Sequence, residues 1–196
     1  MLSFNGELKR NLRKNLLSRR IALQKEVVKF CSVSVFNVLV QSSYFKEAES
    51  ILFYYPHKNE IDLIDVIKYA LLQNKKVLLP QVGQVDNVLN LHEIKNMDED
   101  VEEGPYGIVQ PKEKGLVFSP QDVDVFLIPG IAFDVFGVRL GYGYGYYDRL
   151  LQKVTKKICK IGVAYQWQII GGVPREKYDV VMDFILTEEG IMRCKT

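Results

Sequence analysis

The chain is poor in the residues that build disulfide scaffolds and metal centres. Its 196 residues include only three cysteines, Cys31, Cys159 and Cys194, which lie far apart without a CxxC pair. The two histidines, His57 and His92, are not framed by zinc-ligand spacing. We therefore expect no structural zinc, and the scattered thiols fit a protein of the reducing cytoplasm.

Long hydrophobic runs and a large net charge are missing as well. The longest apolar runs, such as residues 123–132, are interrupted by Asp124, Pro129 and Gly130. They fall well short of the roughly 20 residues that a membrane-spanning helix requires. The formal net charge is only +2, which is too small for a dedicated nucleic-acid binder. We expect neither a membrane nor a nucleic acid among the partners of this chain.

The first twenty residues are rich in arginine and contain Glu7 as their only acid. This composition resembles a transit peptide, but it has no uncharged hydrophobic region of the secretory kind. A folded basic helix explains the same pattern. One alternative takes this helix, together with the tyrosines of the chain, as a nucleic-acid surface that would bind RNA with a steep salt dependence.

The overall composition, 47% hydrophobic and 26% charged, is that of an ordinary globular protein, and we expect residues 1–196 to form a single domain. Helical spacing of apolar residues predicts one or two helices over 7–43 and further helices over 61–72 and 146–154. Nearly continuous apolar runs predict buried strands at 51–56, 76–80, 123–128, 157–164 and 184–187. This alternation indicates an α/β fold, a three-layer α/β/α sandwich around a largely parallel sheet.

The stretch 96–115 differs from its surroundings, because it is acidic at first and then rich in turn-forming residues. It predicts a surface loop rather than a core element, and such a loop is a candidate for a mobile flap.

A glycine-rich segment, residues 137–149 with the sequence GVRLGYGYGYYDR, lies between a predicted strand and a predicted helix. Gly141, Gly143 and Gly145 allow the backbone to approach a ligand closely, and free N–H groups at the start of the next helix can point at an anion. Arg139 adds a planar cation. Asp148 is placed to hold a metal ion between phosphates, although an acid there also favours the helix dipole without any metal.

The glycines alone are a weak signal. Their spacing is neither the GxGxxG dinucleotide fingerprint nor a Walker motif, which needs Gly-Lys followed by Ser or Thr. Residue chemistry leaves two interpretations open for this segment, a phosphate-binding loop and a tight turn with core tyrosines. The hypothesis of a dinucleotide-binding oxidoreductase is weaker still, because the acidic residue expected downstream of the fingerprint is also missing.

Two further groups of residues are candidates for a site. Lys9 and Arg13 are one helical turn apart and Arg20 falls on nearly the same side, so three cations share one helix face. A helix face that is simply exposed to solvent would show the same pattern. Glu60 precedes a predicted helix, where an acid can simply favour the N-terminus.

The segments 129–134 (PGIAFD) and 139–151 (RLGYGYGYYDRLL) closely resemble the signature of the 5-formyltetrahydrofolate cyclo-ligase family. Shorter matches follow in order along nearly the whole chain, at 9–13, at Tyr55-Pro56 with Glu60-Ile61, at Gly107-Ile108 with Pro111, and at 161–164 with Thr187-Glu188. The resemblance implies a fold like that of the sugar-phosphate isomerases and CoA transferases. Because fold does not determine chemistry, an isomerase or a transferase is the rival enzymatic interpretation.

The resemblance also implies roles for individual residues. The residues that would contact ATP are Lys9, Arg13, Arg139, Leu140, Gly141, Tyr142, Gly143, Tyr144, Gly145, Tyr146 and Tyr147. Among them, Arg139 and Lys9 would act on the transferred phosphoryl group. The residues that would contact the folate are Tyr55, Glu60, Tyr142, Gly143, Tyr144, Gly145 and Tyr146. Asp148 and Asp183 would hold Mg²⁺, and Arg20 is expected to be structural. Phe133, Tyr146, Tyr147 and Trp167 are candidates for an aromatic wall against a flat pterin, although a core role explains Trp167 equally well.

Two departures from the family pattern stand out. Some relatives carry cations where this chain has Tyr142 and Tyr144, which shifts more of the charge on the phosphate to Arg139 and Lys9. Tyr178 stands where many relatives have histidine before an aspartate, which weakens any role for Tyr178 and Asp179.

The activity implied by the resemblance is an ATP-dependent cyclisation. The formyl oxygen of 5-formyltetrahydrofolate takes the terminal phosphoryl group of ATP, a neighbouring folate nitrogen closes the ring, and release of phosphate leaves 5,10-methenyltetrahydrofolate. No Ser, His and Asp set or activated cysteine is apparent in the sequence, so catalysis is expected to rest on positioning and charge stabilisation. We expect small-molecule substrates only, and a monomer.

Overall fold

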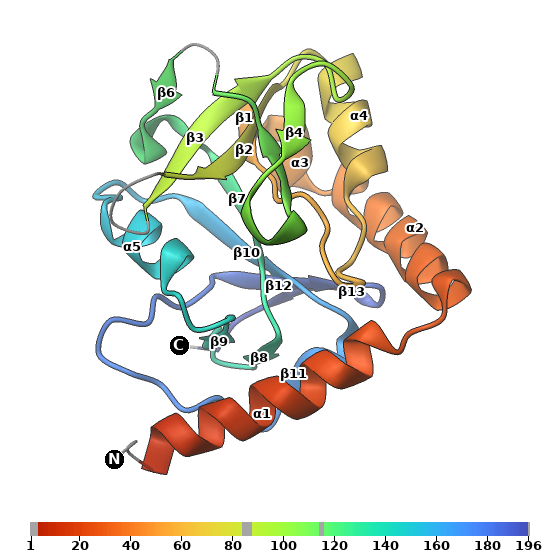
Figure 1. Cartoon of the computed structure of the whole chain (residues 1–196). Coiled ribbons are helices and arrows are strands. Elements are labelled where there is room, and N and C mark those ends of the chain that lie inside the picture. The colour runs from red at the N-terminus through yellow and green to blue at the C-terminus, as the bar shows by residue number, and fades with distance from the viewer. Residues whose placement is uncertain (1–3, 84–87, 114–115, 196) are drawn as a thin grey trace.

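The computed structural model describes residues 4–83, 88–113 and 116–195 (Figure 1). Its helices are α1 (Phe4–Ile21), α2 (Lys25–Gln41), α3 (Ser43–Glu47), α4 (Ile64–Leu72) and α5 (Tyr146–Gln152), with short 3-10 turns at Pro105–Gly107, Pro120–Asp122 and Gln166–Gln168. The helices predicted over 7–43, 61–72 and 146–154 are therefore confirmed, the first as the two helices α1 and α2 followed by the short α3.

The largest sheet formed by the described residues has eight strands in the order β13-β12-β10-β7-β1-β2-β3-β6. They are β1 (Ser50–Leu52), β2 (Lys76–Val82), β3 (Leu89–Ile94), β6 (Val117–Phe118), β7 (Val125–Pro129), β10 (Cys159–Val163), β12 (Phe184–Thr187) and β13 (Gly190–Arg193). The strands from β12 to β2 pair in parallel, whereas β13, β3 and β6 add antiparallel pairs at the two edges. The mixed α/β fold with a largely parallel sheet is confirmed.

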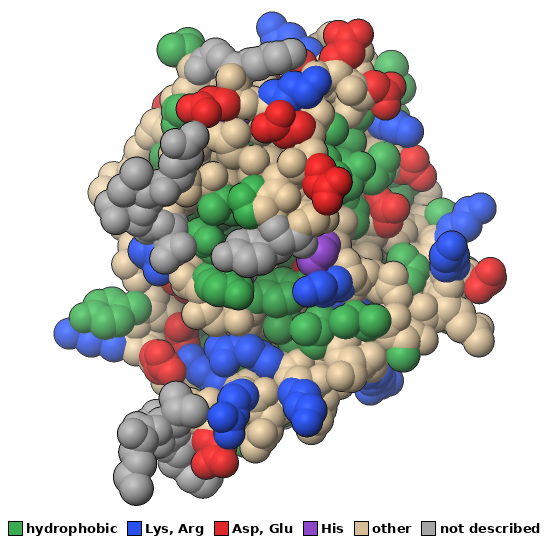
Figure 2. Space-filling model, viewed as in Figure 1, with side chains coloured by type: hydrophobic (Ala, Val, Ile, Leu, Met, Phe, Trp, Pro, Cys, Tyr) green, Lys and Arg blue, Asp and Glu red, His purple; other side chains and the backbone are tan. Residues whose placement is uncertain are grey.

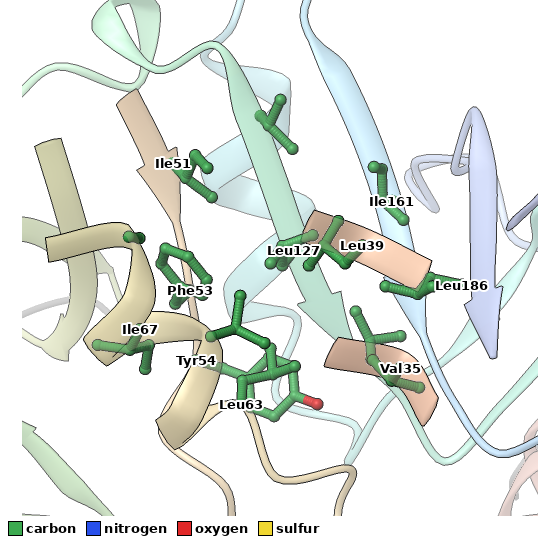
Figure 3. Close-up of a cluster of buried hydrophobic side chains, with 14 of the residues drawn as sticks. Val35, Leu39, Ile51, Phe53, Tyr54, Leu63, Ile67, Leu127, Ile161 and Leu186 are labelled. Atoms are coloured by element: carbon green, nitrogen blue, oxygen red, sulfur yellow. The ribbon is translucent and has the colours of Figure 1, made fainter. Parts of the chain in front are cut away.

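Each central strand contributes alternate side chains to two separate cores, because successive residues of a strand point to opposite faces. On one face, Ile51 and Leu127 pack with Val35 and Leu39 of α2 and with Ile67 of α4 (Figure 3). On the other face, the neighbouring strand residues pack against Leu150 and Leu151 of α5. Helices thus cover both faces of the sheet, which explains why the strand sequences are apolar almost throughout.

A small sheet beside the main one carries the N-terminal helix. It consists of β11 (Ile169–Ile170), β8 (Ala132–Asp134) and β9 (Arg139–Leu140). Leu12 and Leu16 of α1 pack against buried side chains of this sheet, including Ala132 and Leu140. Figure 1 shows α1 lying along β8, β9 and β11, at the side of the molecule opposite α4. The cationic face of α1 is placed by this packing.

Several elements differ from the sequence-based expectation. The stretch 96–115, predicted as a loop, contains a surface hairpin of β4 (Val101–Glu103) and β5 (Val109–Pro111). Strands β3, β6 and β13 were not predicted. β6 and β13 are short strands at the two sheet edges, where few residues leave little periodic signal, and β3 mixes polar with apolar residues. No helix among the described residues has the length and apolar character to cross a membrane.

Candidate active site

A cavity of about 580 Å³ opens beside the carboxyl ends of β1, β2 and β7, the place where parallel α/β sheets usually bind ligands. Figure 2 shows this face hollowed near its centre, with hydrophobic side chains inside the hollow and Lys and Arg side chains gathered below it, over α1. The residues to which the family resemblance gives an ATP or folate contact all lie on the cavity wall: Lys9, Arg13, Tyr55, Glu60 and residues 139–147. The fold therefore brings together segments that are far apart in the sequence.

The glycine-rich loop 141–145 connects β9 to α5 and forms one side of the cavity. Gly143 has φ +103°, and a Cβ atom on it would lie 3.5 Å from Cζ of Arg13. Gly145, just before α5, has φ 68°. Because these φ values are unfavourable for other residues, glycine is needed at both positions for the loop to run closely past Arg13.

The two predicted cations of α1 reach this loop and its surroundings. Nε of Arg13 donates a hydrogen bond to the carbonyl oxygen of Gly141 at 2.8 Å, and burial lowers the pKa of its guanidinium. Nζ of Lys9 lies 3.0 Å from Oδ2 of Asp179 and 3.2 Å from Oε1 of Glu176. Lys9 is therefore in place beside the cavity, but two carboxylates already balance its charge.

Arg139 and Asp148 form an ion pair on the same side of the cavity. Nη2 of Arg139 lies 3.0 Å from Oδ2 of Asp148, and Oδ1 of Asp148 accepts a hydrogen bond from the backbone N–H of Val180 at 3.2 Å. The Arg139 guanidinium lies over the Tyr147 ring, 5.5 Å from its centroid. Its Nε atom is buried and has no hydrogen-bond partner among the described residues. Arg139 thus lies on the cavity wall with one guanidinium donor that has no partner in the described part of the protein.

The opposite side of the cavity holds a buried carboxylate. Glu60 is only 6% exposed, and its Oε1 lies 3.3 Å from Nη2 of Arg20 and accepts a hydrogen bond from the Tyr142 hydroxyl at 3.3 Å. Oε2 accepts from the backbone N–H of His57 at 3.2 Å. Burial raises the pKa of the Glu60 carboxyl, and the Arg20 charge and these hydrogen bonds partly oppose that effect.

Tyrosines rather than Phe133 and Trp167 form the aromatic wall of the cavity. Phe133 is fully buried in the core on the α5 face, and Trp167 stacks on Tyr165 with the Arg19 guanidinium 4.2 Å above its ring. Neither side chain lines the cavity, because both rings are used in packing elsewhere. The wall prediction is therefore wrong for Phe133, and Trp167 has the packing role that was its alternative. The aromatic residues that line it are Tyr54, Tyr55, Tyr142, Tyr144, Tyr146, Tyr147 and Tyr178.

Residues 5–188 match the 5-formyltetrahydrofolate cyclo-ligase family. The chain belongs to this family. It is 30% identical over 183 residues to the 5-formyltetrahydrofolate cyclo-ligase of Mycoplasma pneumoniae, covering 92% of this chain and 99% of that protein. It is 29% identical over 192 residues to the probable 5-formyltetrahydrofolate cyclo-ligase of Caenorhabditis elegans, covering 93% of each.

Solved structures of cyclo-ligase relatives have the same fold. The 5,10-methenyltetrahydrofolate synthetase of Aquifex aeolicus superimposes with a TM-score of 0.84 at 36% identity, over 96% of this chain and 94% of that one. The 5,10-methenyltetrahydrofolate synthetase of Mycoplasma pneumoniae superimposes with a TM-score of 0.75 at 26% identity, over 92% and 98%. The chain is thus an enzyme of the cyclo-ligase family over essentially its whole length.

Of the two aspartates predicted to hold Mg²⁺ in this cyclo-ligase chain, only one belongs to the cavity lining. Asp148 lines the cavity, but Asp183 does not; its Oδ2 lies 2.8 Å from Nζ of Lys160 and accepts from the Lys160 backbone N–H at 2.9 Å. Among the described residues there is no cluster of three or more His, Cys, Asp or Glu side chains suited to a metal ion. Mg²⁺ is commonly held by one or two carboxylates together with substrate phosphates, and Asp148 is the candidate carboxylate that lies on the cavity wall. Asp183 is held by Lys160 outside the cavity lining, and the metal site stays a prediction.

Sequence reasoning missed several cavity residues. Lys9 and Asp179 are 170 positions apart in the chain, so no local pattern connects them. Tyr178 lines the cavity next to Asp179, although it departs from the histidine of many relatives. The mid-chain hairpin also contributes Ile108 and Val109, which only its position in the fold reveals. The other lining residues that were not singled out are Tyr54, His57, Lys58, Leu79, Pro80, Val82, Leu89, Arg149, Gln152 and Glu176.

Proposed function

We propose that this chain closes 5-formyltetrahydrofolate to 5,10-methenyltetrahydrofolate at the expense of ATP, releasing ADP and phosphate. The observation that carries the proposal is a single cavity with two chemically different sides. One side has a glycine loop, Arg13 and Arg139, as suits polyphosphate. The other has a buried carboxylate among tyrosines, as suits a flat, N–H-rich pterin. The printed names of the relatives support the same assignment.

The ATP phosphates are assigned to the α1 side. Backbone N–H groups of the loop 141–145, Arg13 and Arg139 lie along one wall, and together they supply many donors to phosphate oxygens in a partly desolvated place. Lys9 would join them by exchanging Asp179 for a phosphate oxygen. In this assignment Arg139 and Lys9 stabilise the phosphoryl group in the transition state of its transfer, where negative charge spreads over its oxygens.

The folate is assigned to the side formed by Tyr55, Glu60 and residues 142–146. Glu60 offers a fixed carboxylate, because both of its oxygens are already oriented by protein donors. Its remaining lone pairs can accept N–H groups of the pterin ring. Tyrosine rings that line the cavity on either side, including Tyr55 and Tyr146, provide flat apolar contact for the ring.

Magnesium is the expected metal, with Asp148 as the protein ligand and the ATP phosphates as the others. When bound there, Mg²⁺ neutralises phosphate charge. The side chains perform the remaining work. Asp148 also orients Arg139 through the 3.0 Å ion pair, so the same carboxylate fixes the cation that faces the transferred group.

The reaction follows from placing the two substrates in one cavity. The formyl oxygen forms a bond to the terminal phosphorus as the bond from that phosphorus to the ADP oxygen breaks. The neighbouring folate nitrogen then attacks the activated carbon and loses its proton, and phosphate departs with the electron pair of the carbon–oxygen bond. The protein holds the formyl oxygen in line with the phosphorus and excludes water, and no covalent intermediate with the enzyme is required. We also propose that residues 1–196 work as one cyclo-ligase domain and as a monomer.

The direct test is the absorbance of the methenyl product. Purified protein is mixed with 5-formyltetrahydrofolate, ATP and Mg²⁺, and the growth of the near-ultraviolet methenyl band is compared with a reaction that lacks ATP. ATP-dependent growth of the band is the expected result. No growth with folded, nucleotide-binding protein contradicts the proposal and favours an isomerase or a transferase that uses the same loop.

A further inference from the structure

Arg20 is among the most deeply buried side chains of the molecule, and it does not line the cavity. Its side chain is 1% exposed. Nε donates to the carbonyl oxygen of Lys58 at 3.0 Å, and Nη1 donates to the carbonyl oxygen of Gly130 at 3.0 Å. Nη2 faces Oε1 of Glu60 at 3.3 Å and donates to the Tyr142 hydroxyl. Every nitrogen of the guanidinium therefore has a partner.

These partners belong to three separate segments that meet at the cavity. Lys58 and Glu60 lie in the segment after β1, Gly130 follows β7, and Tyr142 belongs to the glycine-rich loop. A guanidinium is planar and presents its donors in a fixed geometry. One rigid group thus sets the relative positions of the folate side and the phosphate side.

The Tyr142 hydroxyl is the connection between those two sides. It accepts a hydrogen bond from Arg20 and donates one to Glu60. Tyr142 stands between Gly141 and Gly143, so a shift of the loop moves the hydroxyl, and a shift of Glu60 pulls on the loop. The contact spans 82 positions of the chain between Glu60 and Tyr142.

We infer that Arg20 is a positioning residue of this enzyme: it holds the Glu60 carboxylate in place and, through the Tyr142 hydroxyl, couples the occupancy of the folate side to that of the glycine-rich loop. The inference rests on the proposed function for the identity of the two ligands. The triad of Arg20, Glu60 and Tyr142 is itself a property of the free protein.

An electrostatic consequence follows from the geometry. Burial raises the pKa of Glu60, and the Arg20 charge is the largest of the effects that lower it. Removing that charge moves the pKa of Glu60 further up. The ionisable side chains that face Glu60 or interact electrostatically with it are Arg20 from α1, Tyr54 after β1, Tyr142 in the loop, Tyr147 in α5 and Tyr165 after β10, and its backbone partner is His57. The tyrosines stay neutral near neutral pH, because burial raises their pKa values, so Arg20 is the cation that matters.

The first experiment measures the Glu60 carboxyl directly by ¹³C NMR titration of the ligand-free protein. We expect an upward shift of the Glu60 pKa in R20M and a value near the wild-type one in R20K, because lysine restores the charge. R19M is the matched control, since Arg19 is the neighbouring cation and stacks on Trp167 instead. An unchanged Glu60 pKa in a folded R20M protein overturns the inference, whatever the protein catalyses.

The second experiment measures coupling. The affinity for 5-formyltetrahydrofolate is determined by calorimetry with and without a non-hydrolysable ATP analogue. In the wild type we expect the analogue to tighten folate binding by at least about fivefold. R20K and Y142F should lose most of that factor, since lysine cannot form the planar set of bonds and phenylalanine has no hydroxyl. R19M should keep it.

Y142F leaves Arg20 in place, so it decides the question even where R20M does not fold. Equal coupling in Y142F and the wild type, or no coupling in the wild type, overturns the connection through Tyr142. A failure of the proposed function looks different: the wild type then makes no methenyl product, while the Glu60 titration still responds to Arg20.

Discussion

On the side of the cavity assigned to the ATP phosphates, Lys9 and Arg139 each face a carboxylate, Asp179 or Asp148, at 3.0 Å. The cations there are nearly buried, with side-chain exposures of 8% for Lys9 and 6% for Arg139, but their carboxylate partners Asp179 and Asp148 are 20% and 22% exposed. On the opposite side, Arg20 and Glu60 are exposed by only 1% and 7%. Partly hydrated pairs can exchange a partner for a ligand at small cost, whereas breaking a buried pair leaves an uncompensated charge. One side is therefore built to exchange partners with phosphate, and the other is built to stay fixed.

The strongest test of the difference between the two sides replaces Arg139, whose Nε atom has no protein partner among the described residues. We expect R139M to lower kcat by about 100- to 1,000-fold, because a donor to a developing phosphoryl charge acts mainly in the transition state. The KM for folate should change little. Steady-state kinetics on the methenyl band check this, with R10M as control, since Arg10 is exposed and pairs with Glu7. An unchanged kcat would contradict the role of Arg139.

On the fixed side, E60Q removes the charge but keeps the shape. We expect the KM for 5-formyltetrahydrofolate to rise by about 10- to 100-fold, because hydrogen bonds to a charged group are lost. The KM for ATP should stay within about twofold if the two sides bind separate ligands. Kinetics with each substrate varied in turn separate these effects, and an equal rise in both values argues against Glu60 as a folate contact.

E60Q should also change how the free energy of unfolding depends on pH. The folded-state pKa of Glu60 is raised above its ordinary value of 4.5. Wild-type protein therefore binds this proton more tightly when folded, and its stability falls as pH rises from 4.5 through the raised value. Glutamine lacks this proton. The stability of the wild type minus that of E60Q should be larger at acid pH than at alkaline pH, as urea unfolding at several pH values measures; a difference that grows with pH would show the opposite shift.

A milder test concerns the loop that separates the two sides. Gly143 has φ +103°, so alanine there introduces backbone strain. We expect G143A to weaken nucleotide binding by about tenfold, with folate binding affected less. Gly172 provides the control, because a Cβ atom on it would meet nothing within 4 Å. Calorimetric titration of both variants with an ATP analogue checks the expectation, and equal affinities would remove the case for a strained loop.

The smallest expected effect comes from freeing Lys9. D179N removes one of the two charges that balance it, and we expect ATP to bind about two- to threefold more tightly at low salt, with the gain fading as salt rises. D65N, an exposed change on α4, serves as the control for net charge. Weaker ATP binding in D179N would mean that Asp179 positions Lys9 instead of competing with phosphate for it.

The parts of the fold that could be predicted are those whose signal is local. The apolar runs at 76–80, 123–128 and 184–187 became β2, β7 and β12, since a strand covered on both faces needs apolar residues throughout. Strand β3 was not predicted because it mixes His92 and Glu93 with apolar residues. The short edge strands carry too few residues to establish a period.

The candidate site divides in the same way. The glycine-rich loop was predicted because its strand, glycines and helix are consecutive, and all of 139–147 lines the cavity. Asp183, Phe133 and Trp167 do not line the cavity, although they were candidates for the metal site and the aromatic wall. A carboxylate or a ring in the right stretch of sequence can be used in packing or by another cation, as Asp183 is by Lys160 and Phe133 by the core.

By itself, the sequence determined the alternation of helices and strands, the glycine loop after β9, and the cationic face of α1, because each depends on residues that are neighbours in the chain. Only the tertiary structure decided that Arg20 pairs with Glu60 and reaches Tyr142, 122 positions away, and that Lys9 meets Asp179. Such contacts are made by burial and by the need to compensate charge in three dimensions, and neither requirement imposes a local pattern on the sequence.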